Sequence, residues 1–330
     1  MADYDLLSIG DVSMDVFLNP HETEVLCNID NKECVICFSY GDKIPVKNLE
    51  FSVGGNAANN VVGTKRLGVN SALVATLGGD SVGNQIVEYL DRERVDLTYA
   101  IQQPMAGSNY STVINYGGER TIFTYHSPRS YEFPVHLPPA PWIYLTSMGE
   151  TFQPFYNHFM EWLTKNKEVK LAYNPGSWQL RAPKEIMQSV LALTHVVYVN
   201  RQEAERITEF GASADKEKDL LKALTALGPA ISIITDGDRG SFIYDGSRFV
   251  KCGVLPVDAY ERTGAGDSFG AGCIAALIKG KSLEEALMWG TVNSASVIGY
   301  VGSQKGLLHD SEIPTWLDRA RSSGVKVEEF

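Results

Sequence analysis

Short apolar segments alternate with helical segments along the second half of the chain. Four strand-sized apolar runs follow one another from about residue 140: Trp142–Leu145, Lys170–Tyr173, His195–Val199 and Ile231–Thr235. Because helical segments lie between them, the strands are expected to run parallel, with helices covering both faces of the sheet. The first part of the chain adds strands at 5–10 and 71–77 and helices at 57–67 and 80–94. The pattern predicts an α/β fold with a central, mostly parallel sheet.

Two segments depart from this alternation. Residues 16–53 and 100–127 are rich in β patterns, with turn residues at Gly41-Asp42 and at Asn115–Glu119. No linker or change of composition separates them from the rest of the 330 residues. We therefore expect one α/β domain over residues 1–330, with a small β-sheet lid assembled from the two inserted segments.

The loop Glu261–Phe269 carries the clearest chemistry. Gly264, Ala265 and Gly266 precede Asp267, and a helical run to Lys279 follows. Backbone N–H groups at the start of a helix favour negative charge, so such a loop can cradle an anion. A carboxylate there weakens static phosphate binding, but it can take a proton from a hydroxyl that attacks phosphorus. This favours phosphoryl transfer to an alcohol.

Two alternatives exist for the same loop. Gly-x-Gly before a helix is often only a tight turn. A dinucleotide fingerprint would need an apolar strand before the first glycine and an acid about 20 residues later. Here the polar run Asp258–Thr263 precedes the loop, and Asp267 would repel a pyrophosphate.

Charge and apolar run lengths exclude several classes of partner. The formal net charge of −11 disfavours nucleic acid and anionic membranes as partners. No apolar run approaches the length of about 20 residues that spans a bilayer, and the N-terminus lacks a secretory signal, so we expect a cytoplasmic protein. Cys27, Cys34 and Cys37 are interpreted as reduced cysteines rather than as a metal site, because no second ligand pair is spaced to match them.

Three motifs together resemble the ribokinase-like (PfkB) family of sugar and nucleoside kinases. They are Gly54–Asn59, Asn200–Glu203 and Thr263–Phe269, in that order. The resemblance extends from Gly10 to about Leu307 and implies a three-layer α/β/α fold with a β lid. It also implies a carbohydrate kinase that uses ATP and Mg²⁺.

The resemblance assigns the catalytic residues. Asp267 is similar to the family's catalytic base, which takes the proton of the acceptor hydroxyl. The backbone of Gly264, Ala265 and Gly266 resembles the anion hole that stabilises the transferring phosphoryl group.

It also assigns the acceptor and metal residues. Asp15 matches the aspartate that accepts hydrogen bonds from acceptor hydroxyls. Gly55, Asn56 and Asn59 match neighbouring positions that approach the acceptor. Asn200 and Glu203 match the Asn-x-x-Glu motif beside the phosphates and a hydrated Mg²⁺, with a helix cap as the alternative. Asp11 is interpreted as a turn residue.

The nucleotide side is expected at two places. Thr235 and Gly237 resemble the loop beside the ribose or phosphates. Thr291, Asn293 and Gly302 fall in the segment that flanks the adenine in the family, and Asn293 is alternatively a buried polar residue of a helix.

Departures from the family pattern limit the prediction. Glu261-Arg262-Thr263 replaces the usual Asp-Thr-Thr, so a monovalent cation such as K⁺ is left open. The expected acceptor is a small sugar or, alternatively, a nucleoside. A non-catalytic kinase-like binding module is the alternative to a kinase. Arg129, Trp178 and Arg181 are candidate acceptor contacts or packing residues. Because an open lid exposes strand edges and an apolar face, we expect a homodimer formed through the lid.

Overall fold

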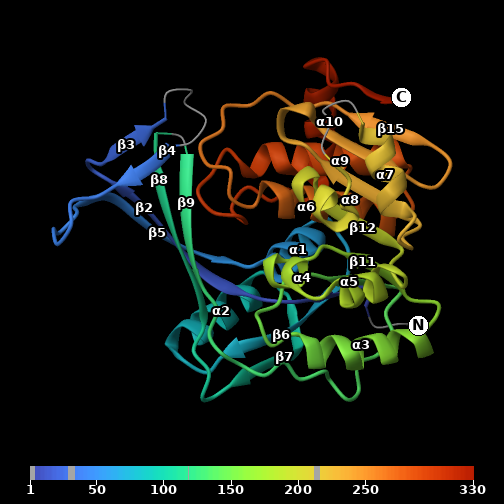
Figure 1. Cartoon of the computed structure of the whole chain (residues 1–330), viewed down its shortest axis with the longest axis horizontal. Helices are drawn as coiled ribbons and strands as arrows, with labels where there is room; N and C mark the ends of the chain where they lie inside the picture. The colour runs from blue at the N-terminus through green and yellow to red at the C-terminus, as the bar shows by residue number, and fades with distance from the viewer. Residues whose placement is uncertain (1–3, 29–33, 118, 212–215) are drawn as a thin grey trace.

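Figure 1 shows a computed structural model of the chain, in which residues 4–28, 34–117, 119–211 and 216–330 are described. Its strands are β1 Leu6–Ile9, β2 Ser13–Pro20, β3 Glu24–Cys27, β4 Cys34–Cys37, β5 Val46–Gly54, β6 Ser71–Gly78, β7 Asp96–Gln103, β8 Asn109–Tyr116, β9 Glu119–Tyr125, β10 Trp142–Leu145, β11 Lys170–Tyr173, β12 Val196–Asn200, β13 Ile231–Thr235, β14 Ser241–Tyr244, β15 Phe249–Cys252 and β16 Val327–Glu329. Its α-helices are α1 Asn56–Arg66, α2 Ser81–Arg92, α3 Gln153–Lys165, α4 Ser177–Arg181, α5 Lys184–Leu191, α6 Arg201–Thr208, α7 Glu217–Thr225, α8 Ala265–Ile278, α9 Leu283–Val297 and α10 Ile313–Ser322. Short 3₁₀ turns occupy Gly237–Arg239 and Asp310–Glu312.

The large sheet is mostly parallel, as the alternation predicts. Within the described residues it has the order β16-β15-β14-β13-β12-β11-β10-β1-β6-β7. The strands from β13 to β7 pair in parallel, and β14, β15 and β16 add an antiparallel edge. The carboxyl ends of the parallel strands therefore meet along one edge, where polar loop residues converge.

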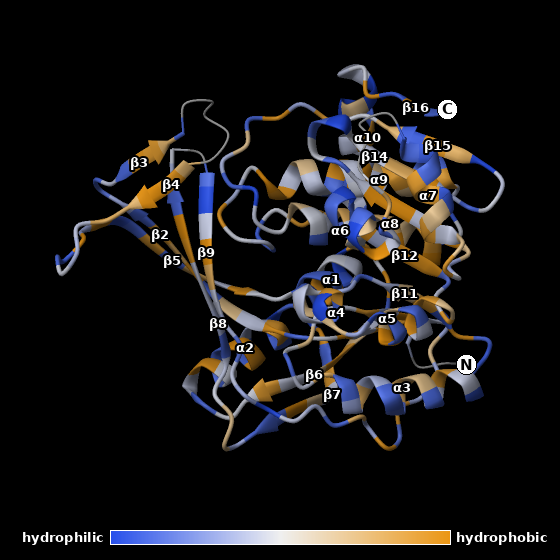
Figure 2. Ribbon diagram, viewed as in Figure 1, coloured by the Kyte–Doolittle hydropathy of each residue, from blue (hydrophilic) through white to orange (hydrophobic). Residues whose placement is uncertain are grey.

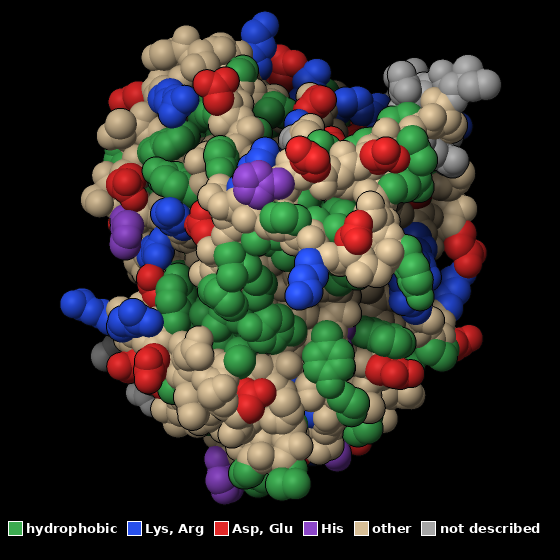
Figure 3. Space-filling view, turned by 90° about the vertical axis from the view of Figure 1, so that its left-hand side faces the viewer, with side chains coloured by type: hydrophobic (Ala, Val, Ile, Leu, Met, Phe, Trp, Pro, Cys, Tyr) green, Lys and Arg blue, Asp and Glu red, His purple; other side chains and the backbone are tan. Residues whose placement is uncertain are grey.

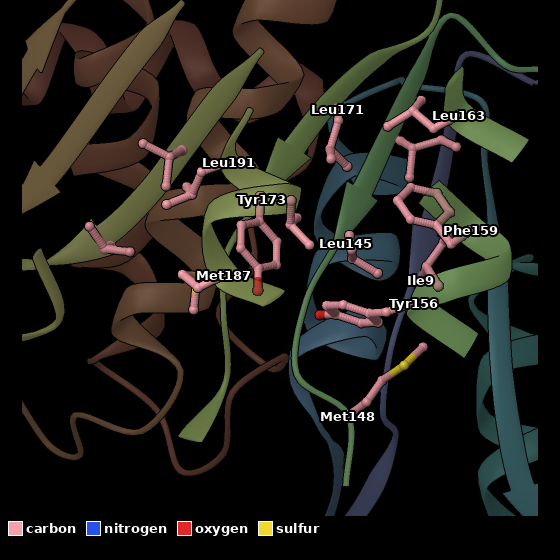
Figure 4. Close-up of a cluster of buried hydrophobic side chains, with 14 of the residues drawn as sticks. Ile9, Leu145, Met148, Tyr156, Phe159, Leu163, Leu171, Tyr173, Met187 and Leu191 are labelled. Atoms are coloured by element: carbon pink, nitrogen blue, oxygen red, sulfur yellow. The ribbon is translucent and has the colours of Figure 1, made fainter. Parts of the chain in front are cut away.

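Strand residues alternate between two apolar layers, so helices cover both faces. On one face, Leu7, Leu145 and Val199 pack with residues of α3, α5, α6 and α7. Figure 4 shows this cluster, with Tyr156 and Phe159 of α3 against Leu145 and Ile9. The alternate positions, such as Leu6 and Tyr144, pack with α8, α9 and α10. Side chains of α1 and α2 cover the same face over β6. This is the three-layer α/β/α fold, and in Figure 2 the apolar colour concentrates in its strands and inner helix faces.

A separate small sheet stands beside the main layers (Figure 1). It has the order β5-β2-β8-β9, and a hairpin of β3 and β4 extends from it. Its strands come from residues 13–54 and 109–125, whereas residues 100–103 belong to β7 at the edge of the main sheet. We call this four-stranded sheet the lid.

The cysteine expectation is wrong for two residues. Cys27 and Cys34 face each other across the β3–β4 hairpin and form a disulfide, while Cys37 is free. No local pattern predicts the pair, because the facing positions depend on the register of the hairpin. Residues 29–33 between the two cysteines lie outside the described part of the chain.

Candidate active site

The glycine loop ends in a sharp turn that starts α8. Gly264 has φ +78°, and a Cβ there would overlap the Cβ of Ser303. The first bond of the helix runs from the Ser268 N–H to the Gly264 carbonyl at 2.8 Å, so the N–H groups of Gly266 and Asp267 precede it. The Ala265 N–H donates to the Arg262 carbonyl at 3.3 Å. The helix start therefore offers the Gly266 and Asp267 N–H groups to an anion more freely than that of Ala265.

Asp267 lies at this helix start and is bonded to α1. Its Oδ2 accepts a hydrogen bond from Asn59 Nδ2 at 2.7 Å. The pKa of Asp267 is raised to about 6. Burial is the largest cause and the negative charge of Asp15 adds to it, while the Asn59 bond opposes the rise. A carboxylate with such a pKa is ionised at neutral pH yet basic enough to take a proton.

The acceptor side is formed by the lid and the start of α1. Asp15 of β2 is buried, and its Oδ1 accepts from the Ser13 hydroxyl at 2.9 Å. Burial raises the pKa of Asp15, and Glu261 raises it too, while Ser13 and Ser111 lower it. A Cβ on Gly54 would overlap Asp15 Oδ2, so glycine there leaves room for this carboxylate.

Gly55 and Asn56 lie where the resemblance implies, at the beginning of α1. Gly55 has φ +90° and caps the helix, and a Cβ there would stand 2.7 Å from the Asp11 carbonyl oxygen. Only glycine lets the β5–α1 turn approach the end of β1 this closely. Asn56 is the first, half-buried residue of α1.

A cleft of about 490 Å³ opens next to the glycine loop. Its lining includes Thr235 at the end of β13 and Gly237 just after it, Ala265 and Gly266 at the start of α8, and Thr291 of α9. Apolar residues complete the wall: Val254, Leu255, Pro256, Val257, Phe269 and Ile298. The cleft combines apolar lining residues with a helix N-terminus, which suits a ligand that carries both a base and phosphates.

Two residues expected at the nucleotide lie elsewhere. Asn293 is fully buried, where its amide donates to the Ser268 carbonyl at 2.7 Å and accepts from the Leu308 N–H at 2.9 Å. It ties α9 to α8, as in the alternative interpretation of a buried polar residue. Gly302 is buried against the lid, where a Cβ would stand 2.8 Å from the Ser52 hydroxyl. Neither residue lines the cleft.

Asn200 and Glu203 form the helix cap that was the alternative to a metal role. The Asn200 side chain accepts from the Glu203 N–H at 2.9 Å, and Glu203 Oε2 accepts from the Asn200 N–H at 2.9 Å. Burial raises the pKa of Glu203, and the negative charge of Asp267 also raises it. The cap thus holds Glu203 close enough to interact with Asp267.

Three groups of polar residues make contacts that the sequence interpretation did not predict. Asp11 is buried and not a simple turn residue: its Oδ1 accepts from the Tyr131 hydroxyl at 2.8 Å, and its Oδ2 lies 3.4 Å from His126 Nδ1. Ser303 and Gln304 both donate to Asn59 Oδ1 at 2.8 Å. Only the order of strands and helices brings these distant residues together, so spacing alone gives no signal.

Glu261 is the third such group. It is buried and its Oε1 accepts from the Thr263 N–H at 2.7 Å, while its Oε2 is buried without a hydrogen-bond partner. Arg129, in contrast, is a packing residue: it is buried and donates to the carbonyls of Ser127 and Gly107 and to Asn109 Oδ1.

Comparison with known proteins identifies the family of the chain. Residues 5–310 match the model of the pfkB family carbohydrate kinases. The chain is 25% identical to an ATP-dependent 6-phosphofructokinase of Thermoanaerobacterium thermosaccharolyticum over 91% of this chain and 89% of that protein. It is 26% identical to a ribokinase of Haemophilus influenzae, over 88% of this chain and 96% of the other. It is also 26% identical to a nucleoside kinase of Methanocaldococcus jannaschii, over 80% and 82%.

Solved structures agree on the fold. Arabidopsis thaliana ribokinase, complexed with ribose and ATP, superposes with a TM-score of 0.77 at 19% identity, over 95% of this chain and 98% of that one. The nucleoside kinase of Methanocaldococcus jannaschii superposes equally well, with the same identity and coverage.

The fold and the family match define a phosphotransferase that uses an alcohol group as acceptor. The chain belongs to the pfkB family of carbohydrate kinases, and its relatives include both sugar kinases and nucleoside kinases.

Proposed function

We propose that the chain transfers the γ-phosphoryl group of ATP to a hydroxyl of a small sugar, with Asp267 as general base. The observation that carries this proposal is a partly exposed carboxylate with a raised pKa at the N-terminus of α8, beside the 490 Å³ cleft. The acceptor oxygen would attack phosphorus, its proton would pass to Asp267, and ADP would leave. The Gly266 and Asp267 N–H groups would stabilise charge on the moving phosphoryl group, together with the helix dipole.

The lining of the cleft supports ATP as its ligand. Val257, Leu255 and Ile298 offer an apolar wall to the base, and Thr235 and Gly237 offer polar groups near the sugar and phosphates. A Cβ on Gly266 would meet only the Tyr198 hydroxyl, at 3.5 Å, so the backbone there stays open to a phosphate.

Glu203 is the proposed contact for Mg²⁺. One of its oxygens caps Asn200, so it has one oxygen to offer, and no group of three or more metal-binding side chains converges anywhere in the described ranges. This suits Mg²⁺ held mainly by phosphate oxygens and water, with Glu203 accepting from that water. When bound, the ion would neutralise phosphate charge.

We propose a monovalent cation such as K⁺ beside Glu261. Its Oε2 is buried without a partner, and an unpaired buried carboxylate oxygen is costly. The residue lies two positions before Thr263, at the entry to the glycine loop. A cation there would offset the charge and hold the loop in place.

The acceptor would lie between Asp15 and Asp267. Asp15 would accept hydrogen bonds from two hydroxyls of the acceptor. Gly55 and Asn56, at the start of α1, would contact the same molecule. Asn59 would hold Asp267 in place through its hydrogen bond. The relatives named above leave a free sugar, a sugar phosphate and a nucleoside as acceptor classes. A nucleoside is the alternative to a small sugar.

The test is ADP release from ATP with a panel that contains ribose, fructose, fructose 6-phosphate, 2-keto-3-deoxygluconate, adenosine, inosine and cytidine. One class should give a rate far above the background hydrolysis of ATP. If no member raises ADP release although ATP binds, a non-catalytic binding module replaces the kinase.

We also propose a homodimer through the lid. Its outer face carries exposed apolar side chains on the two edge strands, β5 and β9, with Leu49 54%, Phe51 60% and Phe123 59% exposed. Figure 3 views this side of the molecule and shows apolar side chains gathered on it. A second copy would cover the face and the strand edges.

Within the described residues, no helix combines the length and the apolar character that crossing a bilayer requires. The cytoplasmic location stays a prediction.

A further inference from the structure

A chain of hydrogen bonds joins the 302–304 loop to the proposed base. Ser303 Oγ and Gln304 Nε2 each donate to Asn59 Oδ1 at 2.8 Å. Asn59 Nδ2 then donates to Asp267 Oδ2 at 2.7 Å. Ser303, Gln304 and Asn59 are all buried. This series of hydrogen bonds runs from the loop after α9, through Asn59 of α1, to the start of α8.

The two donors fix which way the Asn59 amide faces. An amide offers a carbonyl oxygen on one side and an N–H₂ group on the other. Because Ser303 and Gln304 occupy the oxygen, the N–H₂ group must face Asp267. An ionised carboxylate can only accept, so this orientation is the one that stabilises it.

Gln304 itself is held in an unfavourable arrangement to make this bond. Its Oε1 is buried and has no hydrogen-bond partner, whereas its Nε2 is used for Asn59. The backbone around it is anchored, because Arg66 Nη1 donates to the carbonyls of Gln304 at 2.9 Å and Leu307 at 3.1 Å. Buried polar atoms without partners are rare and often mark function.

We propose that Ser303 and Gln304 are positioning residues that act through Asn59 to orient the Asp267 carboxylate, leaving Oδ1 to receive the acceptor's proton. This inference rests on the proposed function of Asp267 as base. In the reaction the acceptor oxygen bonds to the γ-phosphorus as the bond to the ADP oxygen breaks. The hydroxyl proton moves to Oδ1, while Oδ2 stays bonded to Asn59.

Other charged and titratable groups also face Asp267. Asp15 on β2 and Glu203 on α6 interact with it electrostatically, as do the buried phenols of Tyr144 on β10 and Tyr198 on β12. The two carboxylates disfavour its ionised form. Asn59 is the side-chain donor that favours it. Losing the donors behind Asn59 should therefore move the titration of Asp267 upward.

The test compares the full-length wild type with Ser303→Ala/Gln304→Leu. Carboxyl-labelled aspartate is followed by NMR as pH is changed, and the Asp267 signal is identified by its loss in Asp267→Asn. The titration midpoint of Asp267 should rise by about one unit in the double variant, which corresponds to a tenfold weaker preference for the ionised form. Asn59→Leu should give a similar rise, and the combination of all three changes should add little.

Gln179→Leu is the matched control. Gln179 is a buried amide that bonds the backbone N–H and carbonyl of Met148, so the same substitution removes comparable bonds elsewhere. It should lower stability without moving the midpoint of Asp267. Ser303→Ala alone keeps the Cβ that packs against Gly264, so it gives a folded variant if the double variant does not fold, with a smaller rise expected.

The NMR readout does not require turnover. If no acceptor is phosphorylated, the proposed function fails. The titration still decides whether the hydrogen bonds from Ser303 and Gln304 through Asn59 control the pKa of Asp267. An unchanged midpoint in Ser303→Ala and in the double variant, or an equal change in Gln179→Leu, would overturn the positioning role. With an acceptor in hand, kcat should fall in the double variant at pH 6 and recover at higher pH, with the KM for ATP unchanged.

Discussion

Asp267→Asn should stabilise the protein while it removes activity. The carboxylate is ionised in the native state at neutral pH although burial disfavours its charge. Asparagine has nearly the same shape, carries no charge, and can still accept the Asn59 N–H with its oxygen. Replacing the aspartate therefore removes an unfavourable charge without creating a cavity.

The magnitude follows from the pKa. Folding raises the pKa of Asp267 from 3.8 to about 6, a difference of about 2 units, or about 3 kcal/mol at 1.36 kcal/mol per unit. Because the side chain is only partly buried, about 3 kcal/mol is an upper bound. In a domain of this size that corresponds to a rise in Tm of at most about 6 °C.

The sign depends on pH in a defined way. Between pH 3.8 and about 6 the native state binds more protons at Asp267 than the unfolded state, so the wild type loses stability as pH rises. The advantage of Asp267→Asn should be absent below pH 3.8, grow up to about pH 6 and be constant above it. Chemical denaturation of both proteins from pH 4 to pH 8 measures this.

Asp80→Asn is a control of opposite sign. Burial works against ionisation of Asp80, but bonds from the Ser108 hydroxyl and from the Gly83 and Ser108 N–H groups lower its pKa. The ionised Asp80 carboxylate should stabilise the fold above pH 3.8, and this contribution should be lost as pH falls through its lowered pKa in the folded protein. Asp80→Asn should therefore destabilise the protein at neutral pH. An Asp267→Asn variant that is less stable than wild type at pH 8 would refute the argument that burial of charge raises this pKa.

Three further predictions concern the acceptor, the cation and the dimer. Asp15→Ala should weaken acceptor binding about 10²–10³-fold, since two hydrogen bonds to a charged group are lost, with ATP affinity unchanged; calorimetry that shows unaltered acceptor affinity removes Asp15 from the site. Glu261→Gln should abolish any increase of kcat by K⁺ over Na⁺ or choline, and retained K⁺ activation would exclude Glu261 as the cation ligand. Phe51→Asp should convert a dimer into monomers in analytical ultracentrifugation, because a charge would be buried in an apolar interface; a dimer of unchanged stability would place the interface elsewhere.

The sequence predicted the main architecture because its signals are local. The apolar runs at Trp142–Leu145 and Ile231–Thr235 are strands with those bounds. The helix after the glycine loop follows the expected run, as α8, Ala265–Ile278. Strand alternation and helix starts depend on neighbouring residues, so one sequence is enough to find them.

Other parts of the site depend on contacts between distant residues. The Asn59 amide bonds Asp267, which is 208 positions away, a contact that no local pattern predicts. Asn293 and Gly302 match nucleotide positions in sequence, yet Asn293 bonds α8 and Gly302 packs on the lid. A polar residue on a helix gives the same pattern whether it faces a ligand or another helix. The Cys27–Cys34 pairing likewise depends on the hairpin register.

Turnover by Asp267→Asn, measured with ATP binding on the same sample, tests the central claim most directly. ADP release in the presence of the best acceptor should fall by about 10²–10⁴-fold, the range expected when a general base is removed, while the Kd for ATP from calorimetry stays within about twofold of wild type. Turnover at the wild-type rate with ATP still bound would show that Asp267 does not accept the proton.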